Sequence, residues 1–332
     1  MAEDLDTYDR ALGAVLGALV GDALGGVLEF LDHKPSASEV EWALGMPGGG
    51  VFDLAPGQFT DDGEMTIALL NSLLVKRKYN EELAAKSYTE WANSEPFDIG
   101  TATQNALLYG EPADCISGSV SKAASEFNSF SQANGSLMRL SPLAVTGSTY
   151  GFISPHVWRP FERDARLTHP NKNCVDASVV YGTTLVKLIS PEGFFSFDGR
   201  SNPIEFSHVI PFSNKDWEVN EWLADVARGE LPYARKNIGW VKIAFSLAFY
   251  HLMNDSTFTA AMRQTLLLGG DTDTNACIVG AMMGARYGAS GIPQAWRDAV
   301  LNCDTSKGQQ PRPSIYSALD LESKVKHLLY MV

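Results

Sequence analysis

Apolar residues along this chain gather mainly in long runs that fit helices. Residues 9–30 are rich in Ala, Leu and Gly, with small residues at close intervals, as in a buried helix packed tightly on its neighbours. Residues 61–77 begin with acids and end with Lys and Arg, the polarity that the helix dipole favours. Further helices are predicted near residues 80–93, 99–109, 173–190, 215–229, 239–254, 256–268, 272–287, 293–301 and 318–331.

Sheet structure is not expected, because no stretch alternates polar and apolar residues between hairpin turns. Three proline-bearing stretches, residues 31–58, 148–170 and 191–214, are predicted to be long loops. None of them has the composition of a linker, so no domain boundary is drawn. The pattern predicts a helical chain without a division into domains.

Charge and cysteine content narrow the function classes. The 332 residues carry a formal net charge of −13, which argues against a general binder of nucleic acid or anionic membranes. Four cysteines without a CxxC pair are typical of reduced thiols. The N-terminus is acidic, unlike a signal peptide, and Asp22 interrupts the apolar residues 11–28, which we expect to fall short of a membrane span. We therefore expect a cytoplasmic protein.

Two short segments combine acids and hydroxyls at the start of an apolar helix. Residues 269–276 read GGDTDTNA, and residues 57–66 read GQFTDDGEMT. One interpretation is helix capping, in which Asp and Thr accept hydrogen bonds from free backbone N–H groups. The other is a metal centre, because hard oxygen ligands suit Mg²⁺, Ca²⁺ or Mn²⁺. The pattern alone leaves both open.

The similarity of the two segments favours a shared site. Each segment offers two carboxylates and one hydroxyl, and together they could serve two divalent ions that share ligands. Such cations would offset the repulsion between the acids. The residues in question are Thr60, Asp61, Asp62, Asp271, Asp273 and Thr274.

Six segments in order along the chain resemble the ADP-ribosylglycohydrolase family, in particular its dinitrogenase reductase-activating glycohydrolase branch. They are GALVGDALGGVLEF at 17–30, PGQFTDDGEMTIAL at 56–69, DIGTATQNAL at 98–107, NGSLMRLSPLAV at 134–145, LTHP at 167–170 and LGGDTDTNACIVGAMMGARYG at 268–288. The first and last segments, together with TDD, are specific as a set, whereas LTHP alone is weak.

The resemblance implies a fold, an activity and a cofactor. The fold is a single all-α domain of many orthogonally packed helices, here residues 1–332. The activity is hydrolysis of the glycosidic bond between ADP-ribose and a protein side chain, arginine in the branch named above. The cofactors are two divalent cations, Mg²⁺ or Mn²⁺, held by the six residues of the two triplets.

The resemblance also assigns catalytic roles. Cleavage at the ribose passes through an oxocarbenium-like state, and Asp61 or Asp62 is expected to take a proton from the attacking water. The role is not assigned to one of the two alone, because metal-bound carboxylates titrate as a coupled set. Glu29 is expected to position the acceptor or aid proton transfer. Asp22 is expected to be structural, buried and bonded to nearby backbone.

A further set of residues is expected to bind ADP-ribose. Residues 131–139 and the start of DIGT offer small residues and N–H donors for a diphosphate at a helix start. The family commonly has glycine where this chain has Ala133, so the backbone is expected to approach a ligand less closely at this position. Tyr109, Phe130 and Phe245 are candidates for stacking on adenine. The substrate-binding residues expected are Gly100, Thr101, Ser131, Asn134, Gly135, Ser136 and His169.

The acceptor leaves alternatives open. An ADP-ribosyl-serine or poly(ADP-ribose) hydrolase would carry the same motifs, and so would a non-catalytic ADP-ribose-binding protein. GGGVFDLAPGQFTDD at 48–62 resembles the arginine branch. The expected partners are an ADP-ribosylated protein and the product ADP-ribose, with no nucleic acid, no membrane and a monomeric state. The sequence does not indicate the target protein, the pathway or a preference between Mg²⁺ and Mn²⁺.

Overall fold

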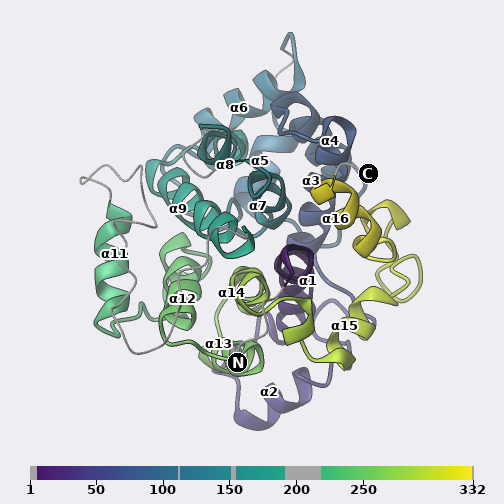
Figure 1. The fold of residues 1–332 in the computed structure, drawn as a ribbon, viewed down its shortest axis with the longest axis vertical. Helices are drawn as coiled ribbons and strands as arrows, with labels where there is room; N and C mark the ends of the chain where they lie inside the picture. Colours follow the sequence, from purple (N-terminus) through teal and green to yellow (C-terminus); the bar gives the residue numbers. More distant parts are fainter. Residues whose placement is uncertain (1–5, 111–112, 151–154, 191–217, 331–332) are drawn as a thin grey trace.

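Helices make up the regular structure in a computed structural model, which describes residues 6–110, 113–150, 155–190 and 218–330 (Figure 1). Over these residues there is no strand, only isolated bridges between Gly49 and Leu54 and between Ala133 and Trp240. The helices are α1 Thr7–Gly25, α2 Ala37–Ala43, α3 Asp61–Lys76, α4 Glu81–Ala92, α5 Thr101–Leu108, α6 Ile116–Phe127, α7 Ser141–Gly147, α8 Pro155–Thr168, α9 Lys172–Ile189, α11 Glu218–Ala227, α12 Val241–Met253, α13 Phe258–Leu268, α14 Thr272–Tyr287, α15 Gln294–Leu301 and α16 Leu321–Tyr330. Short 3₁₀ turns follow at η1 Gly26–Leu28, η3 Ala289–Gly291 and η4 Ser314–Tyr316.

The all-helical prediction is confirmed, but four helices were missed. Helices α2 and α8 lie in stretches predicted to be loops, and α6 and α7 were not predicted. Prolines misled the interpretation of α8, which starts at Pro155 and contains Pro160. Its buried side chains nevertheless recur every four residues, at Val157, Phe161 and Ala165. The predicted loop at 191–214 lies outside the described residues, and the single-domain assignment stays a prediction.

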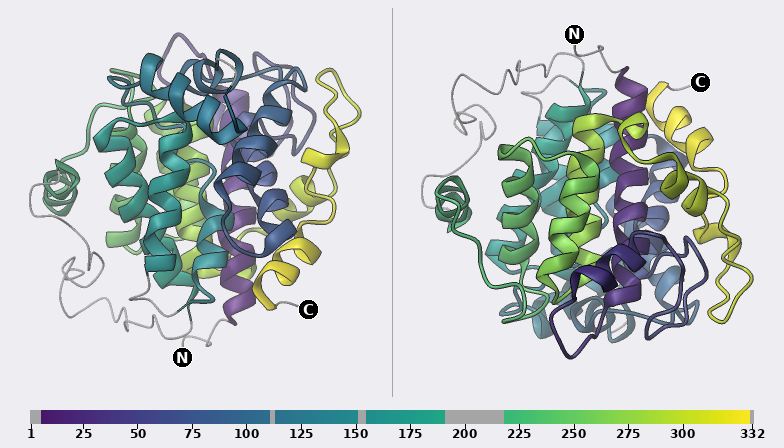
Figure 2. Two further views of the ribbon diagram at one scale, coloured as in Figure 1. Left: turned by 90° about the horizontal axis from the view of Figure 1, so that it is seen from above. Right: turned by 90° about the horizontal axis from the view of Figure 1, so that it is seen from below.

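Helix α1 forms the centre of the molecule with α14 beside it (Figures 1 and 2). By length and composition, residues Thr7–Leu28 could cross a membrane, so the expectation that Asp22 makes this stretch too polar was wrong. The apolar stretch is fully buried among other helices instead. Its hydrophobic character is therefore accounted for by its place in the core.

Glycines let α1 and α14 touch through their backbones. A Cβ atom on Gly13, Gly17, Gly21 or Gly25 would lie 2.2, 2.3, 2.0 or 2.3 Å from a backbone oxygen of α14. The oxygens belong, in that order, to Gly284, Gly280, Ala276 and Thr272. Both series step by four residues, in opposite directions, so the helices run antiparallel along one stripe. This close contact confirms the tight packing that the small residues of α1 predicted.

The antiparallel contact has a consequence for the acids. It places the C-terminal end of α1 against the N-terminal end of α14, where the Thr272 hydroxyl donates to the Gly25 carbonyl at 2.9 Å. Glu29 follows the first end and Asp273 lies in the first turn of the second. Backbone packing thus brings together chemical groups from the two ends of the sequence.

Gly21→Ala is expected to lower the free energy of unfolding by about 3 kcal/mol or more, because its Cβ would overlap the Ala276 carbonyl and force the helices apart. Denaturant unfolding measures the loss. Gly100→Ala is the matched control: no atom lies within 4 Å of its added Cβ and its φ is −62°. This control should lower stability by no more than about 1 kcal/mol, the scale of a substitution at an N-cap position. Equal midpoints for both variants would contradict the packing described here.

Candidate active site

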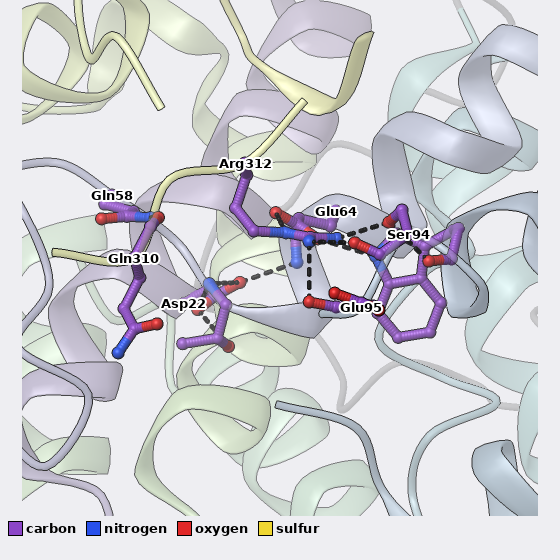
Figure 3. A network of polar contacts seen from close by, with 10 residues as sticks. Asp22, Gln58, Glu64, Ser94, Glu95, Gln310 and Arg312 are labelled. Atoms are coloured by element: carbon purple, nitrogen blue, oxygen red, sulfur yellow. Dashed lines mark hydrogen bonds and ion pairs between the residues drawn. The ribbon is translucent and has the colours of Figure 1, made fainter. Parts of the chain in front are cut away.

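The N-terminal end of α3 is capped from another helix. Thr60 occupies the N-cap position, but its side chain accepts no hydrogen bond from the helix. Asp22 of α1 caps it instead, accepting from the Thr60 N–H at 2.9 Å, the Gly63 N–H at 2.7 Å and the Thr60 hydroxyl at 2.8 Å (Figure 3). Burial raises the pKa of Asp22 to about 7 in spite of these bonds. The structural role expected of Asp22 is confirmed, and the Thr60 side chain does not cap the helix.

The N-terminal end of α14 shows the same departure from simple capping. Asp271 is its N-cap residue, yet its carboxylate accepts from the Asn134 side chain at 2.8 Å and not from a helix N–H. Gly269 and Gly270 precede it with φ of 68° and 85°, and a Cβ on Gly270 would lie 2.3 Å from the Ala234 oxygen. For Thr60 and Asp271, therefore, the capping interpretation is wrong.

The two triplets meet. The Thr60 hydroxyl lies 3.4 Å from Asp273 Oδ2, and the Thr274 hydroxyl donates to Asp62 Oδ2 at 3.2 Å. These contacts join residues more than two hundred positions apart. Asp62 and Asp273 are buried, whereas Asp61, Asp271 and Thr274 are partly exposed. The contacts thus bring the two triplets together at one partly covered place, where the N-terminal ends of α3 and α14 meet.

Burial disfavours the charged forms of these clustered acids. It raises the pKa of Asp61, Asp62 and Asp273 well above the usual range, and the negative charges of neighbouring carboxylates raise each of them further. Asp62 Oδ1 is buried without a hydrogen-bond partner. One oxygen each of Asp22, Asp62 and Asp273 lies within 4.8 Å of the others. Concentrated carboxylates with a buried, unpartnered oxygen fit a hard divalent cation.

A second group of acids adjoins the first. One oxygen each of Glu29, Asp98 and Asp273 lies within 4.8 Å of the others. Glu29 follows η1, and its Oε2 is buried without a partner. Burial, followed by the charge of Asp273, raises the pKa of Glu29, and burial raises that of Asp98 to about 6. The prediction missed Asp98, although it lies in DIGT, two residues before Gly100.

Residues 135–139 form turns and α7 begins only at Ser141, so the expectation of a helix start within residues 131–139 was wrong. The chain pairs instead with residues 237–241: the Asn134 N–H donates to the Gly239 carbonyl at 2.9 Å, and the Val241 N–H to the Gln132 carbonyl at 2.8 Å. The Asn134 side chain also donates a hydrogen bond to Asp271, so these paired segments are connected to the acid site. A pocket of about 460 Å³ opens beside it, lined by Phe130, Ser131, Gln132, Ala133, Asn237, Ile238, Gly239 and Trp240.

The other residues expected to bind substrate differ in their exposure and in their contacts. Gly100 and Thr101 are exposed at the start of α5, as predicted for a helix start. Ser136 is buried and its hydroxyl accepts from Ser178 at 3.1 Å. His169 is buried at the end of α8, where its Cε1 would lie 3.0 Å from a Cβ on Gly135. Gly135 therefore lets the imidazole approach the turn closely.

The candidates for stacking on adenine differ in exposure. Phe245 is fully buried in the core, so it cannot present a face to a ligand. Tyr109 is 56 % exposed, but it does not line the pocket. Phe130 is 97 % exposed and lines the pocket. Of the three, Phe130 is the ring available beside the acid site.

A buried arginine ties the C-terminal part of the chain to the acid site (Figure 3). Arg312 Nε donates to Glu64 Oε1 at 2.8 Å, and Glu64 lies in the first turn of α3. Arg312 Nη1 donates to the carbonyls of Ser94 and Glu95 at 2.7 and 3.0 Å. This guanidinium thereby joins the helix of Asp61 and Asp62 to the segment that leads to Asp98.

Arg312→Leu is expected to lower the free energy of unfolding by about 3–5 kcal/mol, because the Glu64 carboxylate would be left buried without its counter-charge. Arg263→Leu is the matched control, since Arg263 pairs with Glu41 in an equally close but exposed ion pair that water screens. Thermal or denaturant unfolding compares the two. The importance of the buried pair would be refuted by similar losses in both variants.

Comparison with known proteins identifies the family to which the chain is similar. A family model described as ADP-ribosylglycohydrolase matches residues 3–324. The chain is 30 % identical over 292 residues to the ADP-ribosyl-[dinitrogen reductase] glycohydrolase of Rhodospirillum rubrum, covering 87 % of this chain and 89 % of that protein. It is 27 % identical over 299 residues to the ADP-ribosylarginine hydrolase Tri1 of Pseudomonas putida, covering 88 % and 74 %.

A solved structure extends the likeness to the whole fold. It is titled an ADP-ribosylglycohydrolase-related protein complex, and it superposes with a TM-score of 0.71 at 26 % identity. The match covers 98 % of this chain and 99 % of the other. The resemblance identified from the sequence motifs is confirmed, and the chain belongs to the ADP-ribosylglycohydrolase family of enzymes.

Proposed function

We propose that the protein is a dinuclear-metal-dependent hydrolase that cleaves the bond between ADP-ribose and a modified protein arginine. The observation that carries this proposal is the meeting of the two acid-and-hydroxyl triplets at the ends of α3 and α14, next to Glu29 and Asp98. Four carboxylates and two hydroxyls in one place are the ligands that hard divalent cations prefer.

The cations would be Mg²⁺ or Mn²⁺. When bound, two such ions supply Lewis acidity toward the ribose hydroxyls and lower the pKa of a water molecule. Asp62 Oδ1 fits this role because it is buried and has no hydrogen-bond partner. The residues proposed to hold the ions are Thr60, Asp61, Asp62, Asp271, Asp273 and Thr274.

The carboxylates of the chain do the remaining chemistry. The negative charges of the site stabilise the positive charge that grows on the ribose as its bond to the acceptor lengthens. Asp61 or Asp62 accepts the proton of the attacking water. Glu29 Oε2, buried and unpartnered, is the atom placed to position the acceptor or pass a proton to it.

ADP-ribose and the acceptor would occupy different sides of these acids. The pocket of about 460 Å³ lies beside Asn134, whose side chain donates to Asp271, and it would hold the adenosine half of the ligand. Phe130 would stack on adenine. The diphosphate would lie along the turn nearby, near Gly100, Thr101, Ser131, Asn134, Gly135, Ser136 and His169.

Arginine is the acceptor that the second group of acids suits best. A guanidinium carries a fixed positive charge and five N–H donors, which match the carboxylates of Glu29 and Asp98. The name of the relative from P. putida, an ADP-ribosylarginine hydrolase, points to the same acceptor. The cytoplasmic location, the monomeric state and the absence of nucleic-acid partners stay predictions.

Incubation with three substrates tests the proposal. Arginine-, serine- and poly-ADP-ribosylated substrates are offered side by side with Mg²⁺ or Mn²⁺, and released ADP-ribose is quantified. We expect release from the arginine-linked substrate to be at least about 100-fold faster, since a site built for charged hydrogen bonds discriminates strongly against acceptors that lack them. Faster release of ADP-ribose from the serine-linked or polymeric substrate would show that arginine is not the preferred acceptor. Inertness toward all three, with ADP-ribose still bound, would favour a binding protein.

A further inference from the structure

A buried hydrogen-bond chain leads from Arg139 to the imidazole of His169. Arg139 and Asp164 form an ion pair with no exposure, Nε to Oδ2 at 2.9 Å. The guanidinium lies over the Tyr88 ring at 4.5 Å, and the Tyr88 hydroxyl donates to Asp164 Oδ1 at 2.9 Å. Every part of this group has a fixed partner, so Arg139 is held in one orientation.

The protons of this chain can be assigned from its donors. Arg139 Nη2 donates to Thr168 Oγ1 at 2.9 Å, because a guanidinium has no acceptor. Thr168 Oγ1 also lies 2.8 Å from His169 Nδ1. Thr168 is fully buried, and its hydroxyl hydrogen has no other acceptor among the described residues. The hydroxyl therefore donates to Nδ1, and the ring carries its own proton on Nε2.

The other edge of the ring faces the turn at Gly135. A Cβ on Gly135 would lie 3.1 Å from His169 Nε2, and Nε2 makes no hydrogen bond within the described part of the chain. Arg139 Nη1 in turn donates to the Gly135 carbonyl at 3.3 Å. One guanidinium thus fixes both the turn and, through Thr168, the ring that lies against it.

Asn128 anchors the same place from the backbone side. Its side-chain amide donates to the carbonyls of Ala102 in α5 and of Thr168 at the end of α8, at 2.7 and 2.9 Å. The position of His169 is therefore set by α5, α8 and the turn together. An N–H donor held this firmly, with no partner in the protein, is suited to an oxygen atom of a ligand.

We infer that Arg139 and Thr168 are positioning residues that hold His169 as an Nε2–H donor to a diphosphate oxygen of ADP-ribose. This inference rests on the proposed function for the identity of the ligand. Burial, followed by the positive charge of Arg139, lowers the pKa of His169 to about 3. At neutral pH the ring is uncharged, so it donates a single hydrogen bond and does not act as an acid.

The tautomer is measured by ¹⁵N NMR of the full-length protein labelled at histidine, with His169→Gln identifying the signal. We expect the proton on Nε2 from pH 5 to 8 in the wild-type protein without ligand. Thr168→Val should lose this preference and bind ADP-ribose at least about tenfold more weakly, the usual effect of a hydrogen bond to a charged group. Thr168→Ser, which keeps the hydroxyl, should retain both properties.

Two results would overturn the inference while leaving the proposed function in place. One is a wild-type ring with its proton on Nδ1, a measurement that needs no variant to fold. The other is wild-type tautomer and affinity in folded Thr168→Val. Failure of the wild-type protein to bind ADP-ribose would instead overturn the proposed function and the ligand named here. The tautomer, read without ligand, tests the hydrogen-bond chain in either case.

Discussion

Asp62→Asn is expected to lower kcat/KM roughly 10²–10³-fold, the loss typical when one preorganised electrostatic group is removed from an active site. Asparagine keeps the size of the side chain and an oxygen for the Thr274 hydroxyl, which donates to Asp62 Oδ2 at 3.2 Å. What it removes is the negative charge at a buried carboxylate that has an unpartnered oxygen. Asp273→Asn should behave in the same way.

The same substitution should not destabilise the protein when divalent ions are absent. The folded-state pKa of Asp62 is raised, so its charged form is disfavoured in the folded protein and stability falls as pH rises above the unfolded-state value. At pH 7 the neutral amide removes that cost. Asp62→Asn should therefore unfold at the same temperature as the wild-type protein or higher in chelator, while turning over substrate far more slowly.

Steady-state kinetics and thermal unfolding measure the two effects on the same samples. Asp320→Asn is the control, because it makes the same chemical change at an exposed carboxylate that pairs with Lys324. Its rate should match that of the wild-type protein. Wild-type rates for both Asp62→Asn and Asp273→Asn would remove these residues from the active site. A slow but strongly destabilised variant would indicate a structural role instead.

The convergence of the two triplets could be expected from sequence because each carries its own signal. Thr60, Asp61 and Asp62 resemble Asp271, Asp273 and Thr274 in composition and in their place at a helix start. Small residues in α1 likewise predicted a tight contact with another helix. They did not reveal its register, because the glycines of α1 recur every four residues and the partner helix could lie one turn further along. Only the packed structure shows Gly21 against Ala276.

Asp98 and Arg312 could not be found in the same way. Asp98 is a single acid before α5, and its neighbours Glu29 and Asp273 come from distant parts of the chain. Arg312 lies 248 residues from Glu64, its buried partner. Lone charged residues in loops are usually solvated, so no local pattern separates these two from the rest. Long-range packing alone gives them their roles.

Capping shows how one sequence signal can fit two structures. Acids and hydroxyls at a helix start predict a cap on statistical grounds, and they also predict metal ligands. In this chain Asp22 supplies the cap of α3 from another helix. The side chains of Thr60 and Asp271 are thereby left for the acid site. Assigning the cap to Asp22 required the packing of α1 against α3, which local sequence does not specify.

Removal of divalent ions with a chelator is expected to abolish turnover, and Mn²⁺ or Mg²⁺ should restore it. The buried acids explain why: without cations, burial and the charges of neighbouring carboxylates raise the pKa values of Asp61, Asp62 and Asp273 and so favour their protonated forms. Protonated carboxyls are poor ligands and poor bases. Cation binding must therefore displace protons from the site.

Cations should accordingly stabilise the fold more strongly as pH rises. A carboxyl whose folded-state pKa is raised, such as that of Asp22 at about 7, costs stability in the metal-free protein as pH increases through this range. Bound cations offset that cost, and an ion present at 100 times its dissociation constant adds about 2.7 kcal/mol. Calorimetry at pH 5, 6, 7 and 8, with and without Mn²⁺, should show a growing shift of the unfolding temperature.

Two controls separate site binding from general ionic effects. Sodium chloride at matched ionic strength should leave both turnover and the unfolding temperature unchanged, because the site calls for divalent oxygen-seeking ions. Asp62→Asn should lose most of the Mn²⁺-induced shift, whereas Asp320→Asn should keep it. Full activity in excess chelator would exclude the metal mechanism. A shift that persists in Asp62→Asn would place the ions elsewhere on the protein.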